Sequence, residues 1–264
     1  MYKAMYAVGF ALMMLLNLFR YKDYRISQGR AVVYTLVTYV YGVLSAMAMG
    51  RIYTAVSAAA GVDETGGVAI FGAVIFTPVL LLITVLAEKL VAEKASKKTY
   101  KNKHGKDRPY EKKIVSTRNT LDFLTPGIFL ILTCAKLGCF FEGCCYGVEC
   151  GWGVYSKHAD AVVFPVQIFE VATMCAVLLL CYFLKRTRFF RRGMAYPLTA
   201  ALYCVGRFGW EYKRYYAEEM RHIAFGFTIW QFFCIIVFAA SLISIAILYK
   251  TQPSDPLQKK LRRK

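Results

Sequence analysis

The chain has 264 residues, of which 58% are hydrophobic, and a mean hydropathy of +0.42. Ordinary soluble domains are about 45–50% apolar, so this composition argues against a soluble globular domain. The formal net charge of +18 lies mostly in short stretches between apolar blocks. This placement argues against a nucleic-acid-binding protein and favours a membrane protein with basic loops.

Seven apolar blocks follow one another along the chain, each close to the ~20 residues that a helix needs to cross a bilayer. They are Met1–Phe19, Ala31–Gly50, Gly67–Lys89, Thr120–Phe141, Pro165–Leu184, Met194–Glu211 and Phe225–Tyr249. No small-residue cleavage site follows the first block, so we expect it to be retained as a span rather than removed as a signal peptide. The blocks predict an all-α, polytopic membrane protein with seven transmembrane helices, folded as one domain over residues 1–264.

The distribution of Lys and Arg predicts the orientation of these helices. Four segments hold 26 of the 34 Lys and Arg residues, namely Arg20–Arg30, Lys89–Arg118, Lys185–Arg192 and the tail Lys250–Lys264. With seven spans all four lie on one side, and loops rich in Lys and Arg stay in the cytoplasm. We therefore expect the N-terminus outside and the C-terminus in the cytoplasm. The loop Lys89–Arg118 is expected to be solvated, with contact to anionic lipid headgroups as an alternative role.

Ionisable residues inside apolar blocks are candidates for a functional site, because a charge at the bilayer centre costs roughly 2.5–3.5 kcal/mol on insertion scales. In the sixth block, Arg207, Glu211 and Arg214 are spaced four and three apart, which places them on one face of a helix. Two cations around one anion suit an anionic ligand, and a planar guanidinium binds phosphate through two hydrogen bonds at once. The alternative is an ion-pair stripe at the outer end of the helix.

The fourth and fifth blocks add further polar residues. Gln167 and Glu170 are three apart and share a face after Pro165, which predicts either a polar wall of the site or a hydrogen bond between helices. Lys136 lies deep in the fourth block and needs an acidic partner or an anion. Asp122 lies at the start of the same block, where a helix N-terminus favours an acidic side chain.

A segment rich in Cys and Gly surrounds and follows Lys136. Its cysteines are Cys134, Cys139, Cys144, Cys145 and Cys150. Packing of small residues is one interpretation, a disulfide in an outward-facing segment is a second, and a metal site is a third. The Cys-x4-Cys-Cys spacing lacks the paired Cys-x2-Cys of zinc sites, and no pair of His accompanies it, so we expect no metal here.

Several segments resemble, in order, those of the prolipoprotein diacylglyceryl transferase family. They are YKAMYAVGF at Tyr2–Phe10, GRIY at Gly50–Tyr53, GGVAIFGAV at Gly66–Val74, LDFLTP at Leu121–Pro126, AKLGCFFEGCCYG at Ala135–Gly147, FPVQIFE at Phe164–Glu170 and GRFGWEYKR at Gly206–Arg214, followed by Gln231. The fifth fits the family signature GRLGNFINGELWG, and the sixth fits HPSQLYE. The resemblance covers nearly the whole chain and implies the family's seven helices with the N-terminus outside.

Some positions of the family's functional residues are changed in this chain. Phe71 stands where the family has a histidine, and Phe164 replaces the histidine before the proline. Lys136 replaces the signature arginine, Cys139 the signature asparagine and Cys144 the signature glutamate. The resemblance therefore implies that the groups that handle phosphate are kept, whereas those that handle protons are altered.

The resemblance implies a multi-pass transferase of the bacterial cytoplasmic membrane. Such an enzyme moves a diacylglyceryl group from phosphatidylglycerol to the lipobox cysteine of a preprolipoprotein and releases glycerol-1-phosphate, without a metal or organic cofactor. The residues implied are Arg207, Glu170, Glu211 and Tyr2 for catalysis, and Lys136, Arg214, Gln167 and Gly147 for phospholipid binding. Two alternatives stay open. One is a diverged member that binds phospholipid but uses another acceptor or has no activity, and the other is a small-solute transporter, in which broken helices or repeats are typical.

Overall fold

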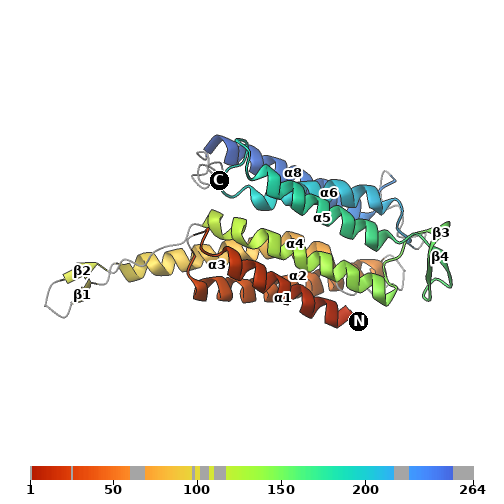
Figure 1. The fold of residues 1–264 in the computed structure, drawn as a ribbon, viewed down its shortest axis with the longest axis horizontal. Coiled ribbons are helices and arrows are strands. Elements are labelled where there is room, and N and C mark those ends of the chain that lie inside the picture. The colour runs from red at the N-terminus through yellow and green to blue at the C-terminus, as the bar shows by residue number, and fades with distance from the viewer. Residues whose placement is uncertain are drawn as a thin grey trace.

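The computed structural model describes residues 2–24, 26–59, 69–96, 99–101, 107–109, 117–216 and 226–251. Within these residues the chain forms seven α-helices and two small two-stranded sheets. The helices are α1 (Tyr2–Arg20), α2 (Gln28–Ala59), α3 (Ile70–Ser96), α4 (Thr117–Glu142), α5 (Val166–Leu184), α6 (Ala195–Glu211) and α8 (Ile229–Thr251). They run side by side as an elongated bundle, with one sheet beyond each end (Figure 1).

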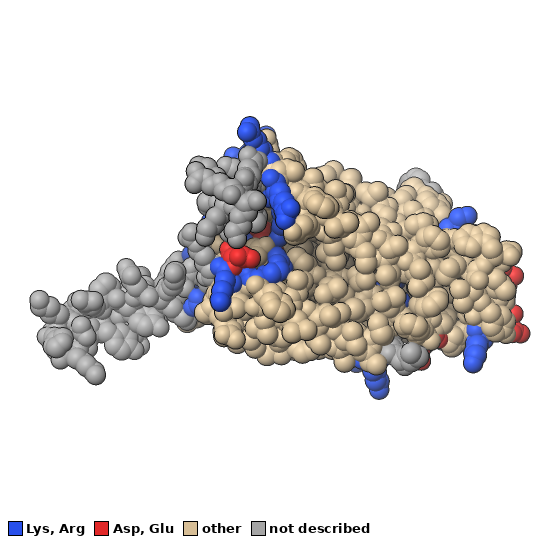
Figure 2. Space-filling model, viewed as in Figure 1, with Lys and Arg blue, Asp and Glu red and all other residues tan. Residues whose placement is uncertain are grey.

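The lengths of these helices and the apolar side chains on their outer surface show that the chain is a membrane protein. Six of the described helices are long and apolar enough to cross a bilayer, and α6 is not among them. With 17 residues, α6 is shorter than the others and carries Arg207 and Glu211. The visible flank of the bundle bears almost no charge, whereas Lys and Arg gather at the end where α4 begins (Figure 2). Large apolar side chains that face outward, such as Ile83, Leu179 and Ile243, suit contact with lipid.

The helix bounds agree with the apolar blocks to within a few residues, except at the C-terminal ends of α2 and α3. Helix α3 was expected to end near Lys89 but continues to Ser96, into the segment expected to be a loop. Helix α2 was expected to end near Gly50 but continues to Ala59. A single Gly inside a helix costs only about 0.5–1 kcal/mol relative to Ala, which the neighbouring turns outweigh. Arg51, expected in an outer loop, therefore lies on a helix with its side chain exposed.

The prediction of an all-α chain is right for the bulk of the fold but misses two short hairpins. Strands β1 (Thr99–Lys101) and β2 (Asp107–Pro109) pair antiparallel within the basic loop after α3. Strands β3 (Glu149–Ser156) and β4 (Ala161–Val163) pair antiparallel between α4 and α5. In β3, Gly alternates with Trp152 and Val154, and Tyr155 follows directly. It is exposed along most of its length, so its period-two pattern carried no buried face that sequence reasoning could detect.

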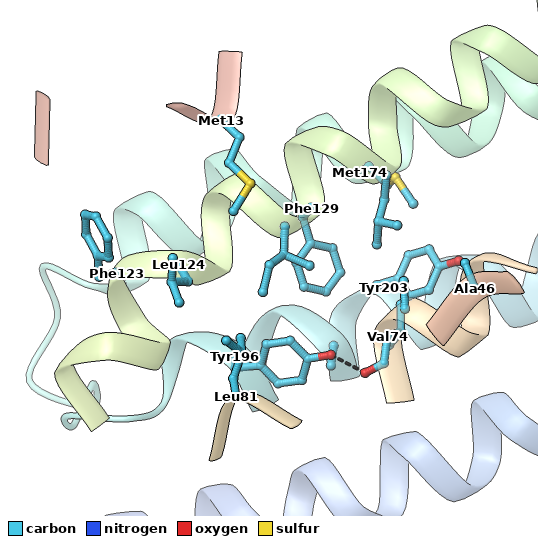
Figure 3. Close-up of a cluster of buried hydrophobic side chains, with 14 of the residues drawn as sticks. Met13, Ala46, Val74, Leu81, Phe123, Leu124, Phe129, Met174, Tyr196 and Tyr203 are labelled. Atoms are coloured by element: carbon cyan, nitrogen blue, oxygen red, sulfur yellow. Dashed lines mark hydrogen bonds between the residues drawn. The ribbon is translucent and has the colours of Figure 1, made fainter. Parts of the chain in front are cut away.

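The core is centred on α4 and also takes buried side chains from α1, α2, α3, α5, α6 and α8. Phe129 of α4 lies among Met13 of α1, Met174 of α5 and Tyr203 of α6 (Figure 3). The backbones approach closely at small residues, as is typical of membrane helices. A β-carbon added at Gly127 of α4 would lie 2.6 Å from Met13 Cγ. This close packing holds α1 against α4, the helix that carries Lys136 of the site described below.

The connections rich in Lys and Arg that follow α1, α3 and α5 lie at one end of the bundle, as far as the structure describes them. Lys185 Nζ, just after α5, donates to the Tyr24 hydroxyl after α1 at 2.7 Å. The buried carboxylate of Asp122 accepts from the backbone N–H groups of Gly193 (2.7 Å) and Ala195 (2.9 Å) and so caps the start of α6. The acidic residue therefore serves the N-terminus of α6 rather than that of its own helix. The start of α1 and the end of α8 lie toward opposite ends of the bundle (Figure 1).

Candidate active site

Glu170 is the centre of a buried ion-pair network at the end of the bundle opposite the basic connections. Its Oε2 lies 2.7 Å from Lys136 Nζ of α4. Its Oε1 lies 2.9 Å from Arg214 Nη2 and also accepts from Arg207 Nη1. The side chain of Glu170 is 1% exposed, and its three partners are 5–7% exposed. One carboxylate thus joins cations from α4, from α6 and from the segment after α6.

Glu211 is the second carboxylate of the network. Its Oε2 lies 2.7 Å from Arg207 Nη2, so the guanidinium of Arg207 spans the two acids. Arg214 Nε lies 3.7 Å from the same oxygen, and Glu211 Oε1 accepts from the Tyr216 hydroxyl. The helix ends at Glu211, so Arg214 reaches this position from the turn that follows and not from the helix face that its spacing predicted.

The network carries one net positive charge, because three cations face two carboxylates. Some buried polar atoms near it also have no hydrogen-bond partner among the described residues, namely the Tyr203 hydroxyl, Gln167 Oε1 and Arg214 Nε. Buried polar atoms are nearly always satisfied in native structures. A net positive charge beside unsatisfied donors and acceptors is the arrangement expected where an anionic, polar ligand binds.

Gly147 fixes the segment that brings Arg214 to the network. It forms an isolated β-bridge with Arg214, and Val148 N–H donates to Lys213 O at 2.9 Å. A β-carbon at Gly147 would lie 2.5 Å from Lys213 O and 2.6 Å from Phe164 O, so only Gly fits between the two strands of backbone. Gly147 therefore holds the segment that carries Arg214 against the backbone before α5.

Gln167 ties the loop after α4 to α5. Its Nε2 donates to Cys144 O at 2.7 Å, one helical turn before Glu170. On the opposite side of the network, Phe71 lies with its ring centroid 5.8 Å from Arg207 Cζ. Phe71 stacks on Trp230, 5.5 Å between centroids, in an aromatic wall where the family has a histidine. No proton-carrying side chain replaces that histidine at this position.

The loop after α4 also gathers three sulfur atoms. The Sγ atoms of Cys139, Cys144 and Cys145 all lie within 4.8 Å of one another. Hydrogen bonds from the Cys139 and Cys144 thiols lower the pKa of the Cys145 thiol, and the charges of Arg214 and Lys136 act in the same direction. The nine cysteines of the chain are free thiols in this structure. The three thiols thus come together in space, although their spacing along the chain lacks the paired Cys-x2-Cys of zinc sites.

The structure brings together seven of the eight residues singled out in the sequence. Five of them form the ion-pair network, and two position its loops: Lys136, Glu170, Arg207, Glu211, Arg214, Gln167 and Gly147. Tyr2 is the first residue of α1, but its side chain lies outside the described residues. Sequence reasoning missed Tyr216 and Thr228, whose hydroxyl lies 3.3 Å from Glu211 Oε1. No spacing or motif in the sequence points to either residue, because the contacts with Glu211 arise only from the fold.

One family model matches the region of the chain that holds the network, and individual relatives match parts of the chain. The family model for prolipoprotein diacylglyceryl transferase matches residues 109–247. A phosphatidylglycerol–prolipoprotein diacylglyceryl transferase of Tropheryma whipplei is 28% identical over 112 residues, 38% of this chain and 41% of that protein. One of Dehalococcoides mccartyi is 35% identical over 66 residues, 24% of this chain and 25% of that protein.

The matches extend over less than half of these relatives, about two fifths of the first and one quarter of the second. The region matched by the family model contains the seven residues brought together above, together with the three clustered cysteines. It leaves out α1, α2 and the whole of α3, and therefore Tyr2 and Phe71.

Proposed function

Because the chain belongs to the prolipoprotein diacylglyceryl transferase family, we propose that it transfers a diacylglyceryl group from phosphatidylglycerol to the lipobox cysteine of preprolipoproteins. The observation that carries this proposal is the buried network of Lys136, Arg207 and Arg214 around Glu170 and Glu211, with its net positive charge. A phosphodiester that enters this network meets cations already held in place. Such preorganised charge is usually the largest contribution to catalysis when negative charge develops on a leaving group.

The roles of the residues follow from their geometry. Arg207 presents a planar guanidinium that already holds two oxygens of two carboxylates, and a phosphate with two oxygens fits the same fork. Lys136 and Arg214 flank it as point charges that neutralise the departing glycerol phosphate. Glu170 and Glu211 keep the three cations in register before the lipid binds.

An apolar cavity in the same bundle suits the acyl part of the lipid. It has a volume of about 350 Å³ and lies among α1, α2, α3 and α4. Its lining includes Tyr39, Ala46, Ile128 and Leu132, with the exposed Lys3 among the lining residues at the outer end of α1. An acyl chain that leaves the bilayer to enter the bundle needs an apolar lining of this kind, because each methylene moved into a water-like environment would cost about 0.8 kcal/mol.

The membrane arrangement is part of the proposal. All seven described helices cross the bacterial cytoplasmic membrane, with the N-terminus outside and the C-terminus in the cytoplasm. The short α6 spans with the others because Arg207 and Glu211 face the interior of the bundle, where their charges are paired. The ion-pair network then lies at the outer side, where a lipobox cysteine that has been carried across the membrane arrives.

A diverged member that binds phospholipid without transfer is the competing function. Phe71 replaces the family histidine beside Arg207, and both carboxylates of the network already pair with cations, so no member of the described network is free to take the proton of the acceptor thiol. The experiment is complementation of a bacterial strain depleted of its own diacylglyceryl transferase. Growth and lipoprotein maturation with this chain, and neither with Arg207→Ala at equal expression, support transfer. Good expression without growth or maturation, in a strain rescued by its own enzyme, would favour the diverged member.

A further inference from the structure

The three clustered cysteines are placed by the end of helix α4. Gly143 takes a left-handed backbone (φ +76°) and its N–H donates to Phe140 O, which ends the helix. The next N–H, that of Cys144, donates to Cys139 O at 3.1 Å. The chain therefore turns back on itself, and two residues five apart in sequence become neighbours. A turn of this kind is why the spacing along the sequence did not reveal the cluster.

The third cysteine of the cluster has a backbone conformation that residues with a β-carbon seldom adopt. Cys145 has φ +59°, in the left-handed region that residues other than Gly, Asn and Asp seldom occupy. Gln167 fixes the preceding peptide by its bond to Cys144 O. Cys139 is buried, Cys144 is half-buried and Cys145 is exposed, so the sulfur cluster runs from the helix end to the surface. Its outer side is open to a ligand from outside the fold.

We infer that Cys139, Cys144 and Cys145 form a zinc site with one open coordination position, and that this position binds the thiol of the acceptor cysteine. Thiolates are favoured zinc ligands, and a tetrahedral site with three protein ligands leaves the fourth position for water or substrate. Three sulfurs within 4.8 Å of one another can reach a common ion without a large change of the loop. The inference deepens the proposed function and rests on it for the identity of the fourth ligand.

The charge of such a site complements that of the ion-pair network. Zinc with three thiolates carries one net negative charge, and the network of three cations and two carboxylates carries one net positive charge. The two lie together, because Lys136 is one helical turn before Cys139 and Gln167 is one turn before Glu170. A buried region with balanced charge is far less costly than either part alone.

A zinc-bound acceptor thiol supplies the deprotonation for which the network has no free base. The thiol loses its proton on binding the ion, and the proton passes to water at the outer end. The thiolate sulfur attacks the carbon of the diacylglyceryl group that is bound to the phosphate oxygen. A carbon–sulfur bond forms, the carbon–oxygen bond breaks, and the glycerol phosphate leaves with the electron pair toward Arg207 and its neighbours. The thioether product is a weaker ligand than a thiolate and is released.

The first test is metal binding by the purified full-length protein, kept reduced with a phosphine because a thiol reductant would occupy the open position. We expect about one zinc per chain, and with cobalt in its place a sulfur-to-cobalt charge-transfer band. Cys139→Ser, Cys144→Ser and Cys145→Ser should each weaken binding at least about tenfold, the smallest loss typical even of changes around a metal's ligands. Cys150→Ser is the matched control, since its sulfur lies in the same loop segment but outside the cluster, and it should bind normally.

The second test asks whether the open position takes a thiol, independently of transfer. A lipobox peptide added to the cobalt protein should raise the sulfur-to-cobalt band by about one third, as the fourth position of the tetrahedron gains a sulfur. The same peptide with Ser in place of its Cys should leave the band unchanged. An equal response to both peptides would contradict the assigned role of the open position.

The outcomes separate this inference from the proposed function. No metal in the reduced protein, or a disulfide among the three cysteines in cells treated with an alkylating agent before lysis, would overturn the zinc site. Metal binding with the peptide response but no transfer by the unmutated protein would support the site and contradict the proposed function. Transfer that persists in full after zinc is removed by a chelator would overturn the role of zinc in activating the thiol.

Discussion

Lys136 of α4 and Glu170 of α5 form a buried ion pair, with Nζ and Oε2 2.7 Å apart, that joins the cysteine-bearing end of one helix to the acidic face of the next. Glu170 also holds Arg207 and Arg214, so one carboxylate sets the positions of three cations. Removing one partner of a buried pair leaves the others uncompensated. The network therefore behaves as one unit, and we expect substitution of any one member to displace the other side chains as well.

Lys136 should tolerate replacement by Arg but not by an apolar residue. Lys136→Arg keeps the positive charge and supplies the side chain that the resembling family has at this position. Lys136→Met leaves Glu170 short of one cation and weakens the field on the leaving phosphate, so transfer should fall by about 10²–10³, as when one stabilising donor is lost. Transfer to a lipobox peptide, with the amount of folded protein measured by size-exclusion chromatography, checks this. Equal activity of Lys136→Met and the unmutated protein would contradict the role.

Glu170→Gln should destabilise the fold as well as the site. Three cations would then surround a neutral amide, and breaking a buried ion pair by removing one partner costs about 3–5 kcal/mol. The midpoint of thermal unfolding in detergent should fall clearly. Glu149→Gln, an exposed acid at the start of β3, is the control and should leave the midpoint unchanged. A small shift for Glu170→Gln would mean that water already screens the network.

Much of this arrangement could be predicted from the sequence, because long apolar blocks report helices directly. The charges of Arg207, Glu211 and Arg214 were assigned to one site from their spacing, and Lys136 from its depth in an apolar block. That Glu170 would be the shared partner could not be deduced, since it lies 34 residues from Lys136 and 37 from Arg207 along the chain. The cysteine cluster was missed for a similar reason, because it depends on the turn at Gly143.

Gly147→Ala should impair transfer through the position of Arg214. A β-carbon there meets Lys213 O at 2.5 Å and Phe164 O at 2.6 Å, and backbone atoms on both sides cannot yield as a side chain would. Displacement of the guanidinium by about 1 Å is enough to cost about 10²-fold in rate. Gly151→Ala is the matched control in the same segment, where nothing lies within 4 Å of the added carbon. The idea fails if both variants transfer equally well.

Cysteine labelling in intact cells checks the proposed orientation. Ser96→Cys at the end of α3 should gain no label from a membrane-impermeant maleimide, because the proposed orientation places this end in the cytoplasm. Lys157→Cys, exposed in the turn between β3 and β4, should be labelled readily. Labelling is measured as the increment over the parent protein, which carries nine native thiols. The reverse pattern would invert the topology.

The most direct test of the account is transfer of labelled diacylglycerol from phosphatidylglycerol to a lipobox peptide by the purified protein in reconstituted membranes, with Arg207→Lys measured beside it. Arg207 spans Glu170 and Glu211 with its two terminal nitrogens, and lysine cannot hold two oxygens in that way. The account predicts transfer by the unmutated protein and a fall of about 10²–10³ for Arg207→Lys, with both proteins equally folded. Near-normal transfer by Arg207→Lys, or none by the well-folded unmutated protein, would contradict it.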